Sequence, residues 1–193
     1  MRDSLECVIL AAGSSSRLGI DKALIDVGSQ TLVSWISRRL SGRVANITIV
    51  ANASNFEEIS KLVSGANVIL NRNPKKGRTG SLKVGIASID SSGAKGYRLL
   101  VVPVDRPGFS DSTLDRLICS KETCCPMKEG KGGHPLMINN IDVEKVRKSS
   151  ADSPLKEVIG ASKFEVLDRF LNLNIDTPED IVNLKEKLKS VND

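Results

Sequence analysis

Short apolar runs alternate with amphipathic stretches along the first half of the chain. Four continuous runs rich in β-branched side chains are typical of strands buried on both faces. They are residues 7–10, 44–50, 68–70 and 98–104. The stretches between them predict helices at residues 31–40, 54–63 and 81–89, the second opening on a capping box that begins at Ser54. This alternation predicts an α/β fold with a mostly parallel, doubly wound sheet.

The second half of the chain is less regular. The elements expected there are a strand at residues 135–138, short helices at 143–148 and 154–159, and an extended segment at 165–175. The last helix has a clear start, because Thr177 suits the N-cap, Pro178 the first helical position, and Asp180 completes a capping box. The chain has no internal repeat and no low-complexity linker, so one domain is expected to span residues 1–193.

Composition limits the classes of protein that the chain can represent. Its 193 residues are 40% hydrophobic and 26% charged, which is ordinary for a globular protein and argues against disorder. No apolar run reaches the roughly 20 residues of a spanning helix, and the first residues lack a signal-peptide layout. Only 3% of the residues are aromatic, and the Lys and Arg residues behind the net charge of +5 form no dense cluster. Neither nucleic acid nor a membrane is therefore an expected partner.

Cysteine usage points to the cytosol. Cys7 lies in an apolar run, and the adjacent Cys124 and Cys125 do not follow the spacing of zinc ligands. His134 is the one histidine of the chain, so no Cys/His zinc site is expected. The sequence therefore predicts a cytoplasmic protein.

Glycines, amides and carboxylates follow the expected strands at the point where each strand ends. In an open α/β sheet, ligands bind beyond the carboxyl ends of the strands, so these residues are expected to line one crevice. They are Gly13 with the serines after it, Asn52, Asn71, Asn73, Asp105 and Asp176. Five cations lie in loops expected to face the same crevice, namely Arg17, Lys22, Lys75, Lys76 and Arg78.

The loop after the first strand suits a triphosphate. Gly13 and the following serines offer backbone N–H groups in a tight turn, and such nests bind anions. Arg17 can fork onto two phosphate oxygens, and Lys22 adds a point charge. The loop matches neither the P-loop nor the G-x-G-x-x-G fingerprint. The alternative is a flexible Gly/Ser connection, which explains the glycine and serines but not the two cations.

Three further features each have a functional and a structural interpretation. Asp105 could hold Mg²⁺, which prefers oxygen ligands, or could begin the turn that ends at Gly108. Asp176 could hold the same ion, or could favour the dipole of the last helix. The glycines before His134 could let the backbone approach a ligand, or could simply form a turn.

Taken together, these residues resemble the MobA-like nucleotidyltransferase family. Residues 10–19 with Lys22 are similar to the signature LAAGxSxRMGxxK, with Leu18 in place of Met. Four more segments resemble family elements in order: NP…G…SLxxG over residues 73–85, DxP at 105–107, GHP at 133–135, and DIDTPED at 174–180 with Asn174 at its first position. The GHP element is typical of the branch of molybdenum cofactor cytidylyltransferases, and the set of motifs resembles this branch most.

The resemblance implies a three-layer, Rossmann-like α/β/α nucleotidyltransferase fold and a role for each matching residue. Leu10, Ala11, Ala12 and Ser81 would line the base pocket, and Asn52 and Asn73 would contact the ribose and base. Gly13, Ser14, Ser15, Ser16, Arg17 and Lys22 would hold the triphosphate. Asp105 and Asp176 would bind Mg²⁺, and Gly132, Gly133 and His134 would lie on the acceptor side. The catalytic residues would be Arg17, Lys22 and Asp105.

The implied reaction is a Mg²⁺-dependent transfer of a nucleoside monophosphate from an NTP to a phosphorylated acceptor, with release of pyrophosphate. Ala12 and Asp176 resemble the cytidylyl branch and Asn174 the guanylyl branch, so CTP is expected ahead of GTP. The expected acceptor is molybdopterin, the organic part of the molybdenum cofactor. A sugar phosphate or a cobinamide phosphate stays open as the acceptor, and so does a nucleotide-binding module without catalysis. The sequence identifies no partner molybdoenzyme or chaperone.

Overall fold

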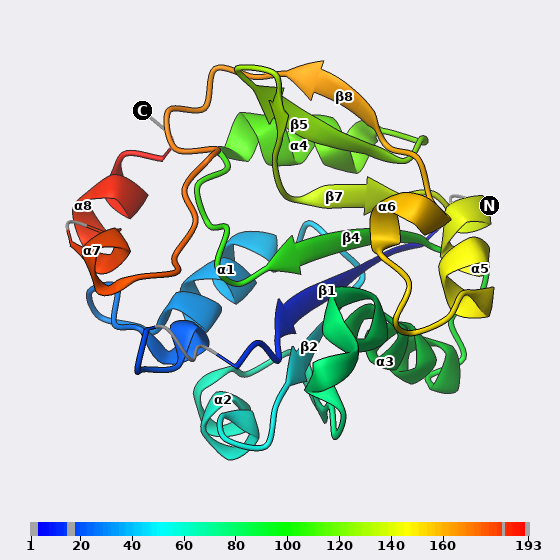
Figure 1. Ribbon diagram of the computed structural model, residues 1–193, viewed down its shortest axis with the longest axis horizontal. Helices are drawn as coiled ribbons and strands as arrows, with labels where there is room; N and C mark the ends of the chain where they lie inside the picture. The colour runs from blue at the N-terminus through cyan, green and yellow to red at the C-terminus, as the bar shows by residue number, and fades with distance from the viewer. Residues whose placement is uncertain (1–3, 15–17, 183, 192–193) are drawn as a thin grey trace.

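In the part of the chain that the structure describes, eight strands form one mixed sheet at the centre. The computed structural model describes residues 4–14, 18–182 and 184–191. The strands are β1 (Leu5–Ala11), β2 (Asn46–Ala51), β3 (Asn67–Leu70), β4 (Arg98–Pro103), β5 (Cys124–Lys128), β6 (Lys131–Gly132), β7 (Leu136–Ile138) and β8 (Ser162–Glu165). Their order is β3-β2-β1-β4-β7-β5-β6, with β8 paired to β5. Figure 1 shows this arrangement with the helices around it.

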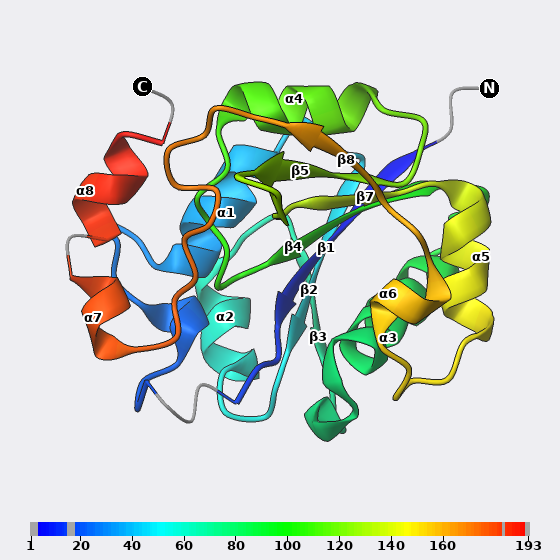
Figure 2. The ribbon, with the colours of Figure 1, turned by 45° about the horizontal axis from the view of Figure 1, so that its top comes forward.

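The first four strands run parallel, as the alternation of strands and helices predicts. β1 lies between β2 and β4, with Val8 opposite Thr48 on one side and Val101 on the other. Figure 2 shows β1 and β2 side by side and pointing the same way. β7 runs antiparallel to both β4 and β5, and β8 is parallel to β5. The carboxyl ends of the parallel strands therefore meet at one edge, where the polar residues of the sequence are expected.

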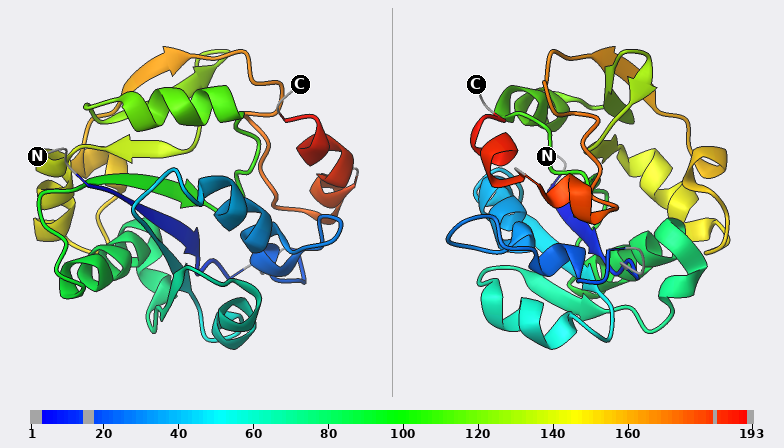
Figure 3. Two further views of the ribbon diagram at one scale, coloured as in Figure 1. Left: turned by 180° about the vertical axis from the view of Figure 1, so that it is seen from behind. Right: turned by 60° about the vertical axis from the view of Figure 1, so that its left-hand side comes forward.

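Helices cover both faces of the sheet, which makes the expected three-layer α/β/α architecture. They are α1 (Leu32–Leu40), α2 (Phe56–Leu62), α3 (Gly77–Ser91), α4 (Asp111–Cys119), α5 (Asn140–Lys148), α6 (Leu155–Val158), α7 (Pro178–Ile181) and α8 (Leu184–Lys189), with short 3₁₀ turns η1 (Lys22–Leu24) and η2 (Pro74–Lys76). Cys7 and Ile9 of β1 pack on the side of α1, α2, α4 and α8, whereas Val8 packs on the side of α3 and α5. Figure 3 shows α1 and α4 over the sheet when it is seen from behind.

A glycine sets the distance between α3 and the sheet. A Cβ atom at Gly85 would lie 2.8 Å from a methyl carbon of Val8 and 3.3 Å from one of Val50. Such contacts are too short for carbon atoms, so a larger residue would push the helix away. Gly85 therefore lets α3 pack close against β1 and β2.

Several elements differ from the sequence expectations. Helix α4 and strand β5 were not expected at all. The extended segment expected at residues 165–175 is a strand only up to Glu165, and turns follow at residues 169–172. Helix α2 begins after Asn55 rather than after Ser54, because the Ser54 hydroxyl and N–H both donate to the side-chain oxygen of Asn52.

The start of the last helical region agrees with its sequence. Thr177 is the N-cap of α7, Pro178 is the first helical residue, and Asp180 completes the capping box.

Among the described residues, no helix is long and apolar enough to cross a membrane.

Candidate active site

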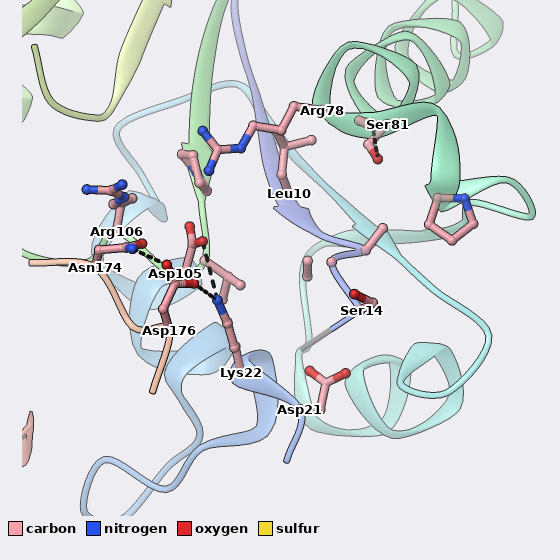
Figure 4. A pocket seen from close by; sticks show the side chains of 17 residues that line it. Leu10, Ser14, Asp21, Lys22, Arg78, Ser81, Asp105, Arg106, Asn174 and Asp176 are labelled. Carbon is pink, nitrogen blue, oxygen red and sulfur yellow. Dashed lines mark hydrogen bonds and ion pairs between the residues drawn. The ribbon is translucent and has the colours of Figure 1, made fainter. Parts of the chain in front are cut away.

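The carboxyl ends of β1 and β4 open into a cavity of about 320 Å³. Nine residues expected at the site line it: Leu10, Ala11, Ala12, Gly13, Ser14, Lys22, Ser81, Asp105 and Asp176. Its other lining residues include Asp21, Gly77, Arg78, Arg106 and Asn174. Ser15, Ser16 and Arg17 lie outside the described residues. Figure 4 shows the cavity with these side chains around it.

Two buried asparagines hold the loop after β1. The side-chain amide of Asn52 donates to the carbonyl oxygen of Gly13 at 3.1 Å. The amide of Asn55 donates to the carbonyl oxygen of Ala11 and to Asp21 Oδ2, both at 2.9 Å. Both asparagines are buried, and Asn52 is not among the residues that line the cavity. Asn52 therefore supports the loop instead of facing the ligand space as expected.

Asp21 fixes the start of the 3₁₀ turn that carries Lys22. Asp21 Oδ1 accepts a hydrogen bond from the backbone N–H of Ala23 at 2.9 Å, which caps the turn. Burial raises the pKa of Asp21 despite the hydrogen bonds from Asn55 and Ala23. Asp21 is not among the site residues expected from the sequence, although an acidic residue two positions before Ala23 is a recognisable cap.

The C-terminal segment brings Asp176 to Asp105. The buried Ile175 donates its backbone N–H to the carbonyl oxygen of Asp105 at 3.0 Å. Asp180 then accepts hydrogen bonds from the N–H groups of Asp176 and Thr177, at 2.9 and 2.8 Å. These hydrogen bonds lower the pKa of Asp180. Figure 1 shows the orange segment between β8 and α7 passing beside the end of β4.

Lys22 connects the two carboxylates. Its Nζ lies 2.5 Å from Asp176 Oδ1 and 3.7 Å from Asp105 Oδ2, and all three side chains are only 15 to 27% exposed. Asn174 donates its side-chain amide to the other oxygen of Asp176. The dashed lines in Figure 4 trace this network. A cation thus already lies between the two acidic side chains that the sequence assigns to a metal.

The start of α3 forms the opposite wall. Ser81 accepts a hydrogen bond from the buried Asn71 at 3.0 Å and donates to the carbonyl oxygen of Gly77 at 3.1 Å. Its hydroxyl is therefore part of the helix start while its side chain lines the cavity. Asn73, which was expected to contact the nucleotide, is exposed and lines neither this cavity nor the next one.

A second cavity of about 650 Å³ adjoins the first. Gly132, Gly133 and His134 line it, together with apolar side chains such as Leu82 and Leu136. Gly133 lies so close to Leu171 that a Cβ would be 2.8 Å from its side chain. Burial, and then the positive charges of Arg78 and Arg106, lower the pKa of His134 to about 4. The imidazole is therefore neutral at physiological pH.

Of the five cations expected at the crevice, three line these two cavities. Lys22 lines the first cavity, Lys76 the second, and Arg78 both. Lys75 lines neither, and Arg17 lies outside the described residues. Arg106 is a further cation that lines the first cavity, and it is not among the cations expected from the sequence. Its position between Asp105 and Pro107 of the DxP element is the signal that could have found it.

Comparison with known proteins identifies the family. The profile of the MobA-like NTP transferase domain matches residues 7–166. The chain is 31% identical to a molybdenum cofactor guanylyltransferase of Sinorhizobium fredii, over 99% of this chain and 96% of that one. It is 18% identical to the molybdenum cofactor cytidylyltransferase of Escherichia coli, over 97% and 99% of the two chains.

Solved structures show the same fold. A nucleotidyl transferase from Methanothermobacter superposes with a TM-score of 0.75 at 18% identity, over 98% of this chain and 99% of that one. The manganese complex of Rv0371C from Mycobacterium tuberculosis gives a TM-score of 0.70 at 19% identity, over 95% and 98% of the two chains. With the profile match and the full-length similarity to a guanylyltransferase, these findings show that the chain is a nucleotidyltransferase and belongs to the family of MobA-like NTP transferase domains.

Proposed function

We propose that the chain transfers a nucleoside monophosphate from an NTP to a phosphorylated acceptor, using the cavity at the ends of β1 and β4. The observation that carries this proposal is the Lys22 ammonium between Asp105 and Asp176, next to the backbone loop at Gly13. A triphosphate needs cations and N–H groups, and its metal ion needs carboxylates. The cavity supplies all three.

The reaction would be an in-line substitution at phosphorus. An oxygen of the acceptor phosphate forms a bond to the α-phosphorus, and the bond from that phosphorus to the bridging oxygen breaks. The electron pair leaves with pyrophosphate. Because the acceptor phosphate is already an anion at neutral pH, no side chain has to act as a base. Catalysis then consists of positioning and charge neutralisation.

The carboxylates fit a divalent metal. In the described part of the chain, no group of three or more His, Cys, Asp or Glu side chains could hold an ion. Mg²⁺ is usually bound by one or two protein carboxylates together with substrate phosphates, which the pair of Asp105 and Asp176 satisfies. A bound Mg²⁺ would supply Lewis-acid stabilisation of the phosphate charge. The manganese complex of the mycobacterial protein supports a divalent metal at this fold.

Residues of this chain would bind the nucleotide and neutralise the charge on its phosphates. Lys22 would neutralise charge on the departing pyrophosphate, with Arg17 as its expected companion. The backbone N–H groups from Gly13 to Ser16 would bind the triphosphate, and Leu10, Ala11, Ala12 and Ser81 would line the base pocket. One catalytic domain over residues 1–193, placed in the cytosol, stays a prediction of the sequence.

The similarity to curated relatives favours GTP over CTP, which reverses the order expected from the sequence motifs. The guanylyltransferase is 31% identical over almost the whole chain, whereas the cytidylyltransferase is 18% identical. The same relatives support the molybdenum cofactor as the acceptor. We therefore propose a molybdenum cofactor guanylyltransferase activity.

The test supplies GTP, CTP, ATP or UTP with Mg²⁺ and with molybdopterin or its molybdenum form, and identifies the product by mass spectrometry. We expect a guanylylated cofactor and pyrophosphate. Asp105→Asn should reduce the rate by at least about 100-fold, a typical cost of removing a preorganised charged partner. Asp115→Asn, at an exposed position of α4, is the matched control and should react like the wild type.

Other products would change the proposal in defined ways. A cytidylylated cofactor would overturn the choice of GTP, and a product with a sugar phosphate or cobinamide phosphate alone would overturn the choice of acceptor. Mg²⁺-dependent nucleotide binding without any product would favour the non-catalytic module.

A further inference from the structure

The two cavities meet at a shared wall. Leu10, Gly77, Arg78 and Pro103 line both of them. Under the proposed function, the first cavity holds the nucleotide and the second is left for the acceptor. The reacting phosphates must then meet at this junction, because the α-phosphate comes from one side and the acceptor from the other.

Two arginines and a histidine surround the junction. Arg78 belongs to the first turn of α3, Arg106 follows Asp105 in the loop after β4, and His134 lines the second cavity. Figure 4 shows Arg78 reaching from α3 toward the end of β4, and Arg106 beside Asn174. Arg106 lines the first cavity, His134 lines the second, and Arg78 lines both, so the three groups lie on the two sides of the shared wall. The positive charges of both arginines contribute to the lowered pKa of His134.

These groups lack the partners that such groups usually have. Within residues 4–14, 18–182 and 184–191, neither Arg78 nor Arg106 forms an ion pair with a carboxylate. Arg106 Nε and His134 Nδ1 are shielded from solvent and have no hydrogen-bond partner in that part of the chain. By contrast, the half-buried Arg39 and Arg147 form ion pairs with Asp111 and Asp90. Leaving a buried polar atom unsatisfied is costly, so such atoms at a cavity point to a ligand that completes them.

We propose that Arg78, Arg106 and His134 form an anion-binding subsite at the junction, which holds the terminal phosphate of the acceptor for attack on the nucleotide. This inference rests on the proposed function. It adds Arg78 and Arg106, which the family motifs leave unassigned, to His134, which the resemblance already places on the acceptor side. The guanidinium groups donate to the phosphate oxygens, and His134 donates from Nδ1 in the corresponding neutral tautomer. The rest of the acceptor lies along the apolar lining of the second cavity.

The charges of the subsite match a phosphate monoester. Near neutral pH such a group approaches the dianion, because its second pKa is about 6. Two arginines supply two positive charges, and the neutral His134 adds a hydrogen bond without a third charge. The start of α3, which has no side-chain cap, adds a favourable dipole for an anion.

The test measures binding without turnover. Phenyl phosphate, a phosphate monoester with an apolar body, is titrated calorimetrically into the protein saturated with Mg²⁺ and a GTP analogue that has a methylene group between the α- and β-phosphates. We expect Arg78→Gln and Arg106→Gln each to weaken phenyl phosphate binding by about tenfold or more, the usual scale for a hydrogen bond to a charged group. Arg38→Gln, at an exposed position of α1, is the matched control and should bind like the wild type.

Two results would overturn the proposal. One is unchanged phenyl phosphate affinity in both variants. The other is an equal loss of affinity for the GTP analogue, which would assign the arginines to the triphosphate instead. Arg106→Lys keeps the charge and should restore part of the affinity, whereas a general loss of folding would not be rescued in this way.

The binding test is separate from the test of the proposed function. Should no acceptor react but the two variants still lose phenyl phosphate affinity, the subsite stands and the proposed reaction fails. Should guanylyl transfer occur with an unchanged KM for the acceptor in both variants, the reaction stands and the subsite fails.

Discussion

The side chain of Lys22 has two opposing effects on the carboxylate pair of Asp105 and Asp176. Its ammonium keeps Asp105 and Asp176 together, since two carboxylates brought close would otherwise repel each other. The same ammonium competes with any metal ion that uses these carboxylates. A triphosphate that draws Lys22 toward itself would therefore favour metal binding, and the two ligands would bind cooperatively.

Lys22→Met separates the two roles. Transfer should fall by at least about 100-fold, because a charge partner of the phosphates is lost. Binding of Mn²⁺ without nucleotide, followed by electron paramagnetic resonance, should instead become about fivefold tighter or more, because the competing cation is gone. Lys61→Met, at an exposed position of α2, should change neither quantity. Weaker Mn²⁺ binding in the Lys22 variant would contradict the competition.

Among the helices and strands, the sequence predicts those whose formation depends on signals in neighbouring residues. Strands β1 to β4 each overlap one of the apolar runs found in the sequence, and α7 has its complete start signal. Strand β5 was missed because it contains two cysteines and a proline, and its place depends on pairing with β7 and β8. Helix α4 did have a signal, since Ser110 caps it by accepting a hydrogen bond from the N–H of Thr113.

The segment before α7 depends on one glycine. A Cβ at Gly108 would lie 1.8 Å from the carbonyl oxygen of Phe170, so the two backbones touch. Gly108→Ala should therefore displace residues 169–172 and lower the free energy of unfolding by about 1–3 kcal/mol, as overpacking does. It should also slow transfer, because the displaced segment leads to Asp176.

Urea denaturation measures the stability change. Gly160→Ala is the control, because a Cβ there meets nothing within 4 Å and the stability should stay within about 0.5 kcal/mol of the wild type. A Gly108→Ala protein as stable as this control would contradict the close packing.

For the whole molecule, the sequence predicts which strand ends meet and most of the residues that line the cavity, but it does not predict every one of them. Asp105 and Asp176 come together as expected, because both follow segments that reach the same edge. Asn52 also follows a strand in the sequence, but its side-chain amide donates a hydrogen bond to the carbonyl oxygen of Gly13. Only the three-dimensional packing distinguishes these cases.

His134 links the pH to the stability of the whole fold. Its pKa is about 4 in the folded protein and about 6.5 when the chain is unfolded. Between pH 4 and pH 6.5, His134 is protonated in the unfolded chain but neutral in the folded protein, and this proton binding favours unfolding. The contribution of His134 to the free energy of unfolding is therefore complete above pH 6.5 and is lost as the pH falls toward 4. From pH 7 to pH 5, the free energy of unfolding should drop by about 2 kcal/mol from this group alone.

Denaturation at both pH values compares the wild type with His134→Gln. The variant cannot titrate at this position, so its loss of stability between pH 7 and pH 5 should be smaller by about the same 2 kcal/mol. An equal loss in both proteins would show that His134 does not determine this pH dependence.

The contact between Asp105 and Ile175 joins two segments that are synthesised at different times. Asp176 follows Asp105 by roughly 70 residues, so at about 5–20 residues per second it leaves the ribosome roughly 4–14 seconds later. During that interval the growing chain already contains the loop at Gly13, Lys22 and one carboxylate. The nascent protein thus passes through a stage in which the acidic pair is incomplete, and translation itself sets the order in which the site is assembled.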